Sequence, residues 1–223
     1  MPCTPHIEFP TEHESHILVR GASFTTIKSV AKVPEKGMGE DVLERRLESL
    51  YEMSRRMEEC LEMARQVIPE SCFQPVPEAF LRVLIADVLQ GHRTGHSFEM
   101  LKAMWASAQA WLSCIIRNGD TSSLDAETNN AAHTFLDSVI HVCLFRRFFV
   151  TADYRLALGP DQVDVGDQVL IIKDAHMPVV IRAHETSGVY RMLGPAYVRG
   201  LMKGPVPEMI AAGGMQWASF EIA

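Results

Sequence analysis

Apolar residues recur at three- and four-residue intervals through the first two thirds of the chain, which is the spacing of amphipathic helices. Pro69 follows the first such stretch and ends it, because the residue before a proline disfavours helical geometry. Ser97 precedes the third stretch and suits an N-cap. The pattern predicts helices over residues 40–67, 77–91, 97–116 and 124–145.

From residue 146 onward the apolar runs become short and β-branched, and Gly, Pro and Asp separate them, which is typical of strands joined by tight turns. Gln168 to Ile172 is continuously apolar after its first residue and predicts a buried strand. The pairs Gly159-Pro160 and Gly194-Pro195 are interpreted as turns. We expect strands over residues 168–172, 178–182, 189–193, 196–199 and 215–222, with a short earlier one at 17–19 that Gly21 breaks.

Strands this short and this close in sequence must pair mostly antiparallel. Four helices and about seven strands without βαβ alternation predict an α+β fold, with the helices packed on a small, mostly antiparallel sheet or partly closed barrel. A length of 223 residues suits one sizeable core. We expect an extended lead-in over 1–16 and a single domain over 17–223, helical from about 40 to 145 and β from about 146 to 223.

Charge and composition remove several classes of function. A net charge of −7 argues against nucleic-acid binding, which needs a concentrated basic surface. No run reaches the roughly 18 apolar residues of a membrane span. The N-terminus has no signal-peptide pattern and the cysteine count is five, so we expect a cytoplasmic location.

The motifs of common catalytic sites are also missing from the sequence. It has no dinucleotide-binding glycine pattern, P-loop, serine elbow or zinc-protease helix, and the cysteines lack the spacing of metal ligands. We therefore expect no cofactor and no metal.

The remaining chemical signal is a surplus of soft and aromatic side chains, with 12 Met and 10 Phe. Met104, Trp105 and Trp111 on the third predicted helix either fill the core or form the wall of an apolar ligand cavity. His141 on the fourth predicted helix is interpreted as a core or boundary residue, and His92 and His96 as exposed loop residues.

Polar groups near apolar strands form the second signal. Arg182 ends a buried-looking strand and needs an acceptor there, either an ion-pair partner such as Asp167 or Glu185, or a ligand carboxylate. Tyr190 and Tyr197 are either core aromatics or hydrogen-bond donors. Arg146 and Arg147 lie between apolar residues, so we expect one of them to point inward.

Several segments occur in the order of a known family. They read RRFFVT (146–151), LALGP (156–160), GDQVLII (166–172), PVVIR (178–182) and YRMLGPAYVRGLMKG (190–204), with weaker matches in LVRGASFTTI (18–27) and EAFLRVLIAD (78–87). This series resembles the region that follows the signalling domain in fungal heterokaryon-incompatibility (HET) proteins. The chain departs from the family's acidic or histidine positions at Thr25, Pro195, Arg199, Lys203 and Pro205.

The resemblance implies a function, because short HET-like proteins without the signalling domain occur among fungal biosynthetic genes. Among such proteins, the chain resembles the norbornene-forming Diels–Alderases of sordaricin-type pathways. We therefore expect a cofactor-independent cyclase that carries out an intramolecular Diels–Alder reaction on an apolar, terpenoid-like substrate bearing a carboxylate or carbonyl. A non-enzymatic regulatory or interaction module, and a terpenoid or lipid carrier, remain the alternatives.

The expected site combines polar donors with apolar walls. Arg182 and Tyr197 are the candidate catalytic residues. The candidate substrate-binding residues are Met104, Trp105, Trp111, Arg146, Tyr190 and Met202.

Overall fold

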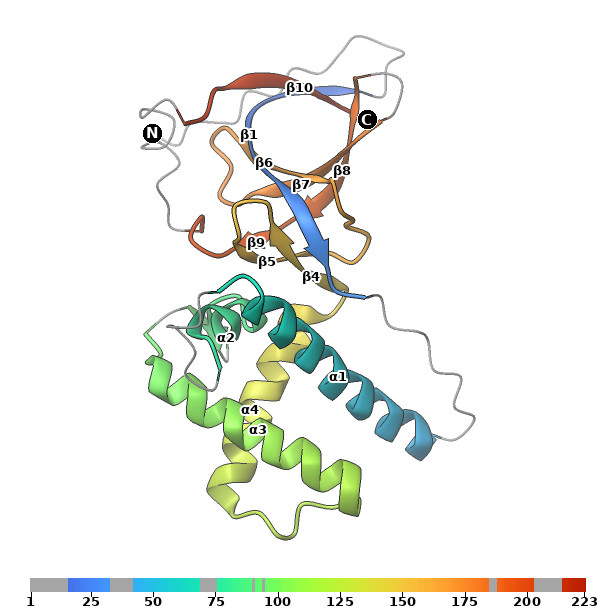
Figure 1. The fold of residues 1–223 in the computed structure, drawn as a ribbon, viewed down its shortest axis with the longest axis vertical. Helices are drawn as coiled ribbons and strands as arrows, with labels where there is room; N and C mark the ends of the chain where they lie inside the picture. The colour runs from blue at the N-terminus through green and yellow to red at the C-terminus, as the bar shows by residue number, and fades with distance from the viewer. Residues whose placement is uncertain are drawn as a thin grey trace. The chain divides into compact units, whose positions relative to one another are not determined.

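The protein is described here by a computed structural model that covers residues 16–32, 42–68, 76–89, 91–93, 95–184, 188–202 and 214–223. Several segments lie outside the described residues: the lead-in before residue 16, and the ranges where the sequence also predicts a loop (34–37), most of a proline-rich connector (69–77) and a helical turn (206–212). The chain divides into two compact units, which we call the β unit (residues 1–30 and 145–223) and the helical unit (residues 31–144) (Figure 1).

The helical unit confirms the helices that the apolar spacing predicted. Their bounds are α1 Val42–Arg65, α2 Glu78–Leu84, α3 Phe98–Asn118 and α4 Ala126–Cys143. Ser97 caps α3 as expected, since its side chain accepts from the backbone N–H of Met100, and Gly119 ends the helix in left-handed geometry. Asp125 caps α4 in the same way through the N–H of Thr128 at 2.7 Å.

The second helix is much shorter than predicted, and a hairpin begins within the range predicted to be helical. The backbone turns left-handed at Ala86 and Asp87, and β2 (Val88–Leu89) pairs antiparallel with β3 (His92–Arg93). The Arg82 guanidinium explains the early end, because it donates to Glu78, to Asp87 and to the backbone carbonyl of His96. One arginine thus holds the chain on both sides of the turn.

Aromatic rings fill the core of the helical unit. Trp105 on α3 is 8% exposed and lies edge-on to two other rings, with centroids 5.5 Å from Phe80 and 6.0 Å from Phe135. Such edge-to-face pairs stabilise a core beyond the area that they bury. Trp105 therefore joins α2, α3 and α4.

The described residues of the β unit form eight strands in one mostly antiparallel sheet. They are β1 Ile17–Val30, β4 Arg146–Thr151, β5 Leu156–Pro160, β6 Gln168–Ile172, β7 Val179–Ala183, β8 Tyr190–Pro195, β9 Tyr197–Val198 and β10 Ala218–Ile222. Their order is β10-β8-β7-β6-β1-β4-β5-β9, and a further pairing of β10 with β1 closes part of the sheet into a ring (Figure 1). Only β10 and β8 pair in parallel. The α+β class and the mostly antiparallel pairing are confirmed.

Strand β1 corrects the prediction of a short strand that Gly21 breaks. The strand runs unbroken for 14 residues and pairs in turn with β10, β6 and β4. Gly21 serves close packing instead, because a Cβ there would meet Cδ1 of Leu170 at 2.9 Å and the carbonyl oxygen of Ile171 at 3.0 Å.

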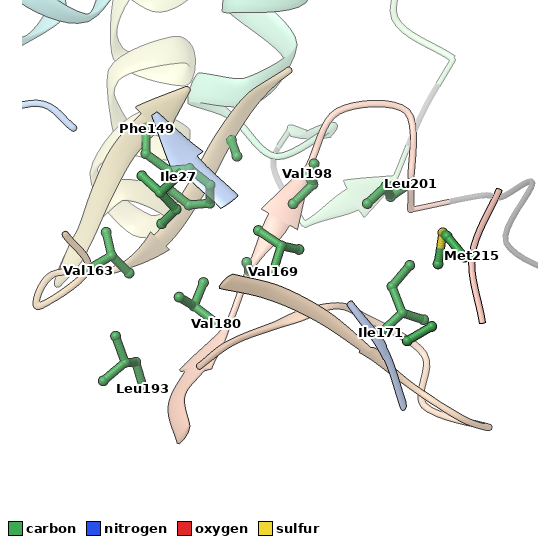
Figure 2. Packing of buried hydrophobic residues seen from close by; sticks show 13 residues of the cluster. Ile27, Phe149, Val163, Val169, Ile171, Val180, Leu193, Val198, Leu201 and Met215 are labelled. Carbon is green, nitrogen blue, oxygen red and sulfur yellow. The ribbon is translucent and has the colours of Figure 1, made fainter. Parts of the chain in front are cut away.

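Strand β6 is buried on both faces, as its continuous apolar run predicted. Val169 and Ile171 belong to one buried cluster, the large β core, while Leu170 packs into a second one, the small β core. Figure 2 shows side chains of the large β core, among them Ile27, Phe149 and Val180, drawn together from several strands.

The two Gly-Pro pairs do not form turns as predicted but end β5 and β8. They lie against each other, since a Cβ on Gly194 would meet Cγ of Pro160 at 3.0 Å. Gly159 borders the large β core, where a Cβ would meet Cε1 of Phe149 at 2.8 Å. Close packing requires glycine at position 159, whereas Gly194 also has a φ of 141°, which residues with a side chain rarely adopt.

Candidate functional site

Arg182 on β7 binds a buried carboxylate of its own unit. Its Nε donates to Oδ1 of Asp167 at 2.7 Å and its Nη2 to Oδ2 at 2.8 Å. The hydrogen bond to Asp167 raises the pKa of Arg182 above its ordinary value. The expected ion pair with Asp167 is confirmed, whereas Glu185, the other partner considered, lies outside the described residues.

The loop between β5 and β6 is held by arginines from three strands. Arg182 also donates to the carbonyl of Gln162 at 2.8 Å, and Arg147 on β4 donates to the carbonyl of Val163 at 2.7 Å. Arg191 on β8 makes a longer contact of 3.5 Å with the side-chain oxygen of Gln162. These contacts give Arg182 and Arg147 a structural role at this end of the sheet.

The other site candidates of the β unit are distributed over several strands. Tyr197 on β9 is 4% exposed, and half-buried Arg146 lies on β4 opposite Pro160. Tyr190 on β8 packs its ring on Phe220 at 5.5 Å, beside the small β core. Met202 is half-buried just after β9. Their proposed roles in catalysis or substrate binding remain predictions.

The remaining three candidates lie on α3 in the helical unit. Met104 is 7% exposed and Trp105 is enclosed by aromatic rings, so both fill the core. Trp111 is half-buried, and its ring lies edge-on to the imidazole of His133 at 5.1 Å. Its indole N–H is buried without a hydrogen-bond partner among the described residues.

An open groove of about 700 Å³ lies along α4, and we call it the α4 groove. Residues at helical spacing on one face of α4 form its floor, and the β2–β3 hairpin contributes the rest of the lining. The lining residues are Val88, Gly91, Asn130, His133, Thr134, Asp137, Ser138, His141 and Val142. His133 lines the groove and also contacts Trp111 on α3.

The ionisable side chains that line the α4 groove among the described residues are two imidazoles with a carboxylate between them in sequence. His133, Asp137 and His141 are all exposed and follow one another at four-residue intervals, which places neighbours about 5–6 Å apart at Cβ. Ser138 is committed to the helix, because its hydroxyl donates to the carbonyl of Thr134 at 3.0 Å. The imidazoles therefore remain as donors or acceptors toward a ligand, and the carboxylate as an acceptor.

Sequence reasoning missed this groove. His141 is exposed and lines it, so the interpretation of His141 as a core or boundary residue is wrong. The spacing His133, Asp137, His141 on a predicted helix was the available signal, but the groove also needs the β2–β3 hairpin, which the sequence did not predict.

Three further findings concern membrane-spanning helices, metal sites and cysteines. No helix within the described residues is long and apolar enough to cross a membrane. Over the same ranges, no three His, Cys, Asp or Glu side chains are grouped so that they could hold a metal ion. Cys60, Cys114 and Cys143 form no disulfide among the described residues, and burial, together with the nearby Cys143, raises the pKa of Cys60 above its ordinary range.

Comparison with protein families gives a match to the Het-6 beta-barrel domain over residues 19–211. The matched range includes all four helices and every strand of the sheet except β10, although β1 enters it at its third residue. Comparisons with curated proteins and with solved structures found no match.

Proposed function

The chain belongs to the Het-6 beta-barrel domain family, and on that premise we propose that it is a cofactor-independent cyclase with its substrate site in the α4 groove. The reaction we propose is an intramolecular Diels–Alder cycloaddition of an apolar, terpenoid-like molecule. The observation that carries the proposal is the α4 groove, whose volume of about 700 Å³ lies within the roughly 300–1,000 Å³ typical of small-molecule sites.

A cycloaddition makes modest demands on side-chain chemistry. Two new carbon–carbon σ bonds replace two π bonds of the substrate, no atom leaves, and no electron passes to or from a second reactant. The protein must hold diene and dienophile in contact, and such orientation contributes several kcal/mol in favourable cases. Apolar Val88 and Val142 supply wall surface for a flexible chain.

Hydrogen bonding to a carbonyl on the dienophile would lower the barrier further. A well-placed donor contributes about 2–4 kcal/mol in comparable sites. His133 and His141 have ring nitrogens at the groove and are our candidates for this donor. The earlier candidates Arg182 and Tyr197 are less suited, because Arg182 would have to leave the 3%-exposed carboxylate of Asp167 unpaired and Tyr197 is 4% exposed.

The proposal is tested by incubating the purified chain with linear polyenes that carry a diene and a carbonyl-activated alkene. We expect faster cyclisation and one dominant stereoisomer relative to buffer. Val142→Phe, which fills the groove, should remove both effects, whereas Ala126→Phe, at an exposed position of α4 outside the groove, should keep them. Thermal melts of both variants establish that each is folded. An unchanged rate and product ratio with the wild-type chain would refute the cyclase.

A second candidate is the non-enzymatic interaction module, which the packing of the β unit favours. Its large β core is formed by 13 buried residues, and the Arg182–Asp167 pair closes one end of the sheet with structural contacts alone. This candidate predicts that loss of the gene alters cell fusion or stress behaviour without a change in metabolites. A terpenoid carrier would instead bind in the α4 groove without turnover.

A further inference from the structure

We propose that the α4 groove selects a neutral ligand, with a carbonyl or hydroxyl as its polar group, over the matching carboxylate, and that Asp137 is the residue that discriminates. The inference rests on the groove as the substrate site and names the substrate class more narrowly. It also revises the expectation of a carboxylate-bearing substrate.

The described lining of the α4 groove carries one formal negative charge. Among the described residues that line the groove, Asp137 alone carries a formal charge when histidines are counted as neutral. None of the ion pairs among the described residues includes Asp137. Within the described residues, a carboxylate on the ligand would therefore meet the like charge of Asp137 without a paired cation, and the net charge of −7 adds to the repulsion.

The carboxylate of Asp137 lies between the two histidines along α4. Asp137 lies one helical turn from His133 on one side and one turn from His141 on the other, in the middle of the polar row. A ligand polar group that reaches either imidazole is thus close to the carboxylate as well. A neutral carbonyl can accept from an imidazole N–H, and a hydroxyl can also donate to Asp137.

The other lining residues of the groove are uncharged or apolar. Asn130, Thr134 and Ser138 are uncharged, and the Ser138 hydroxyl already donates within the helix. Valines at positions 88 and 142 and Gly91 leave apolar or open surface. A largely apolar molecule with one neutral polar group matches this distribution.

Isothermal titration calorimetry at pH 8 with farnesal, farnesol and farnesoic acid tests the inference, because the three share one apolar chain. We expect the aldehyde and the alcohol to bind roughly three- to fivefold more tightly than the acid, the size of effect that one exposed charge produces. Asp137→Asn should remove the difference by strengthening binding of the acid. Raising the salt concentration should reduce it in the wild-type chain.

Glu127→Gln is the matched control, since it removes one exposed carboxylate from the same helix outside the groove. Ten residues of helix separate it from Asp137, about 15 Å, which exceeds the screening length at physiological salt. The discrimination should persist in this variant.

Other outcomes are equally informative. If the acid binds as tightly as the aldehyde, the charge of Asp137 does not discriminate, and the inference is overturned while the groove remains a ligand site. A preference that survives Asp137→Asn overturns the role of Asp137. If none of the three binds, the groove is not a ligand site, and the site assignment of the proposed function falls with the inference, although a cyclase acting elsewhere would still show turnover.

Discussion

Arg182 and Asp167 form a bidentate pair in which the two partners are unequally buried. The carboxylate of Asp167 is 3% exposed, whereas the Arg182 side chain is 43% exposed. Asp167 also accepts the backbone N–H of Asp164 at 2.7 Å, so its oxygens serve both the pair and the loop. The arginine is therefore the solvent-facing partner of a buried anion.

This asymmetry predicts that loss of Arg182 destabilises the fold. Arg182→Gln would leave a buried carboxylate without its cation, and we expect the free energy of unfolding to fall by about 2 kcal/mol, below the cost of breaking a fully buried pair. Urea denaturation at pH 7 measures the change. Arg191→Gln, which removes only a 3.5 Å contact from an exposed position, should cost less than about 0.5 kcal/mol. Equal effects of the two variants would contradict the assigned role.

Local signals in the sequence were sufficient for most elements of the fold. Ser97 caps α3, and the apolar run of β6 is buried on two sides, because capping and hydrophobic periodicity act within a few residues. The antiparallel pairing followed from the short connections between strands.

The remaining fold predictions were wrong because contacts between residues distant in sequence determine the structure there. Arg82 ends α2 by donating to the backbone carbonyl of His96. Strand β1 continues through Gly21, because Leu170 occupies the space that a side chain at position 21 would need. The Arg182–Asp167 pair could be anticipated from a charge at the end of an apolar strand. The α4 groove could not be anticipated, because it requires the β2–β3 hairpin, which neither the hydrophobic periodicity nor the turn residues of the sequence indicate.

Gly200 and Arg155 give a second prediction. Gly200 has a φ of 87°, and a Cβ there would meet Nη1 of Arg155 at 2.5 Å. Gly200→Ala should therefore combine backbone strain with displacement of the guanidinium, and we expect a loss of about 2 kcal/mol in unfolding free energy. Thermal or urea denaturation measures it.

Gly166→Ala separates the two causes. Gly166 also has a positive φ, 93°, but nothing lies within 4 Å of its added Cβ, so only backbone strain of about 1 kcal/mol applies. Combining Gly200→Ala with Arg155→Ala should recover the part due to the clash. An additive double variant would show that Arg155 is not displaced.

The hydrogen-bonded carboxylate of Asp153 should make part of the stability of the β unit sensitive to acid. Burial opposes ionisation of Asp153, but hydrogen bonds from Thr151, Arg155 and Thr25 outweigh it and lower the pKa of the carboxyl. A pKa lowered in the folded state contributes stability above the unfolded value near 3.9, and that contribution is lost as the pH falls through the folded value. The side chain is 38% exposed, so we expect only about 0.5 kcal/mol after screening by solvent.

Urea denaturation at pH 7, 4 and 2.5 measures this component. Asp153→Asn should be less stable than the wild-type chain at pH 7, and the difference should shrink toward pH 2.5. Asp161→Asn, at an exposed loop position, controls for the loss of one surface carboxylate. A constant difference between Asp153→Asn and wild type at all three pH values would contradict the assignment.

Gly159 tests how tightly the large β core is packed. A Cβ at this position would meet Cε1 of Phe149 at 2.8 Å and Cγ1 of Val163 at 3.3 Å, and both neighbours are fully buried (Figure 2). Because a close-packed interior relaxes little, Gly159→Ala should lower the free energy of unfolding by about 1–3 kcal/mol. Phe149→Leu leaves a void of its own, yet combined with Gly159→Ala it should cost less than the sum of the two single variants. A strictly additive cycle, measured by urea denaturation, would mean that the core accommodates the methyl group by moving elsewhere.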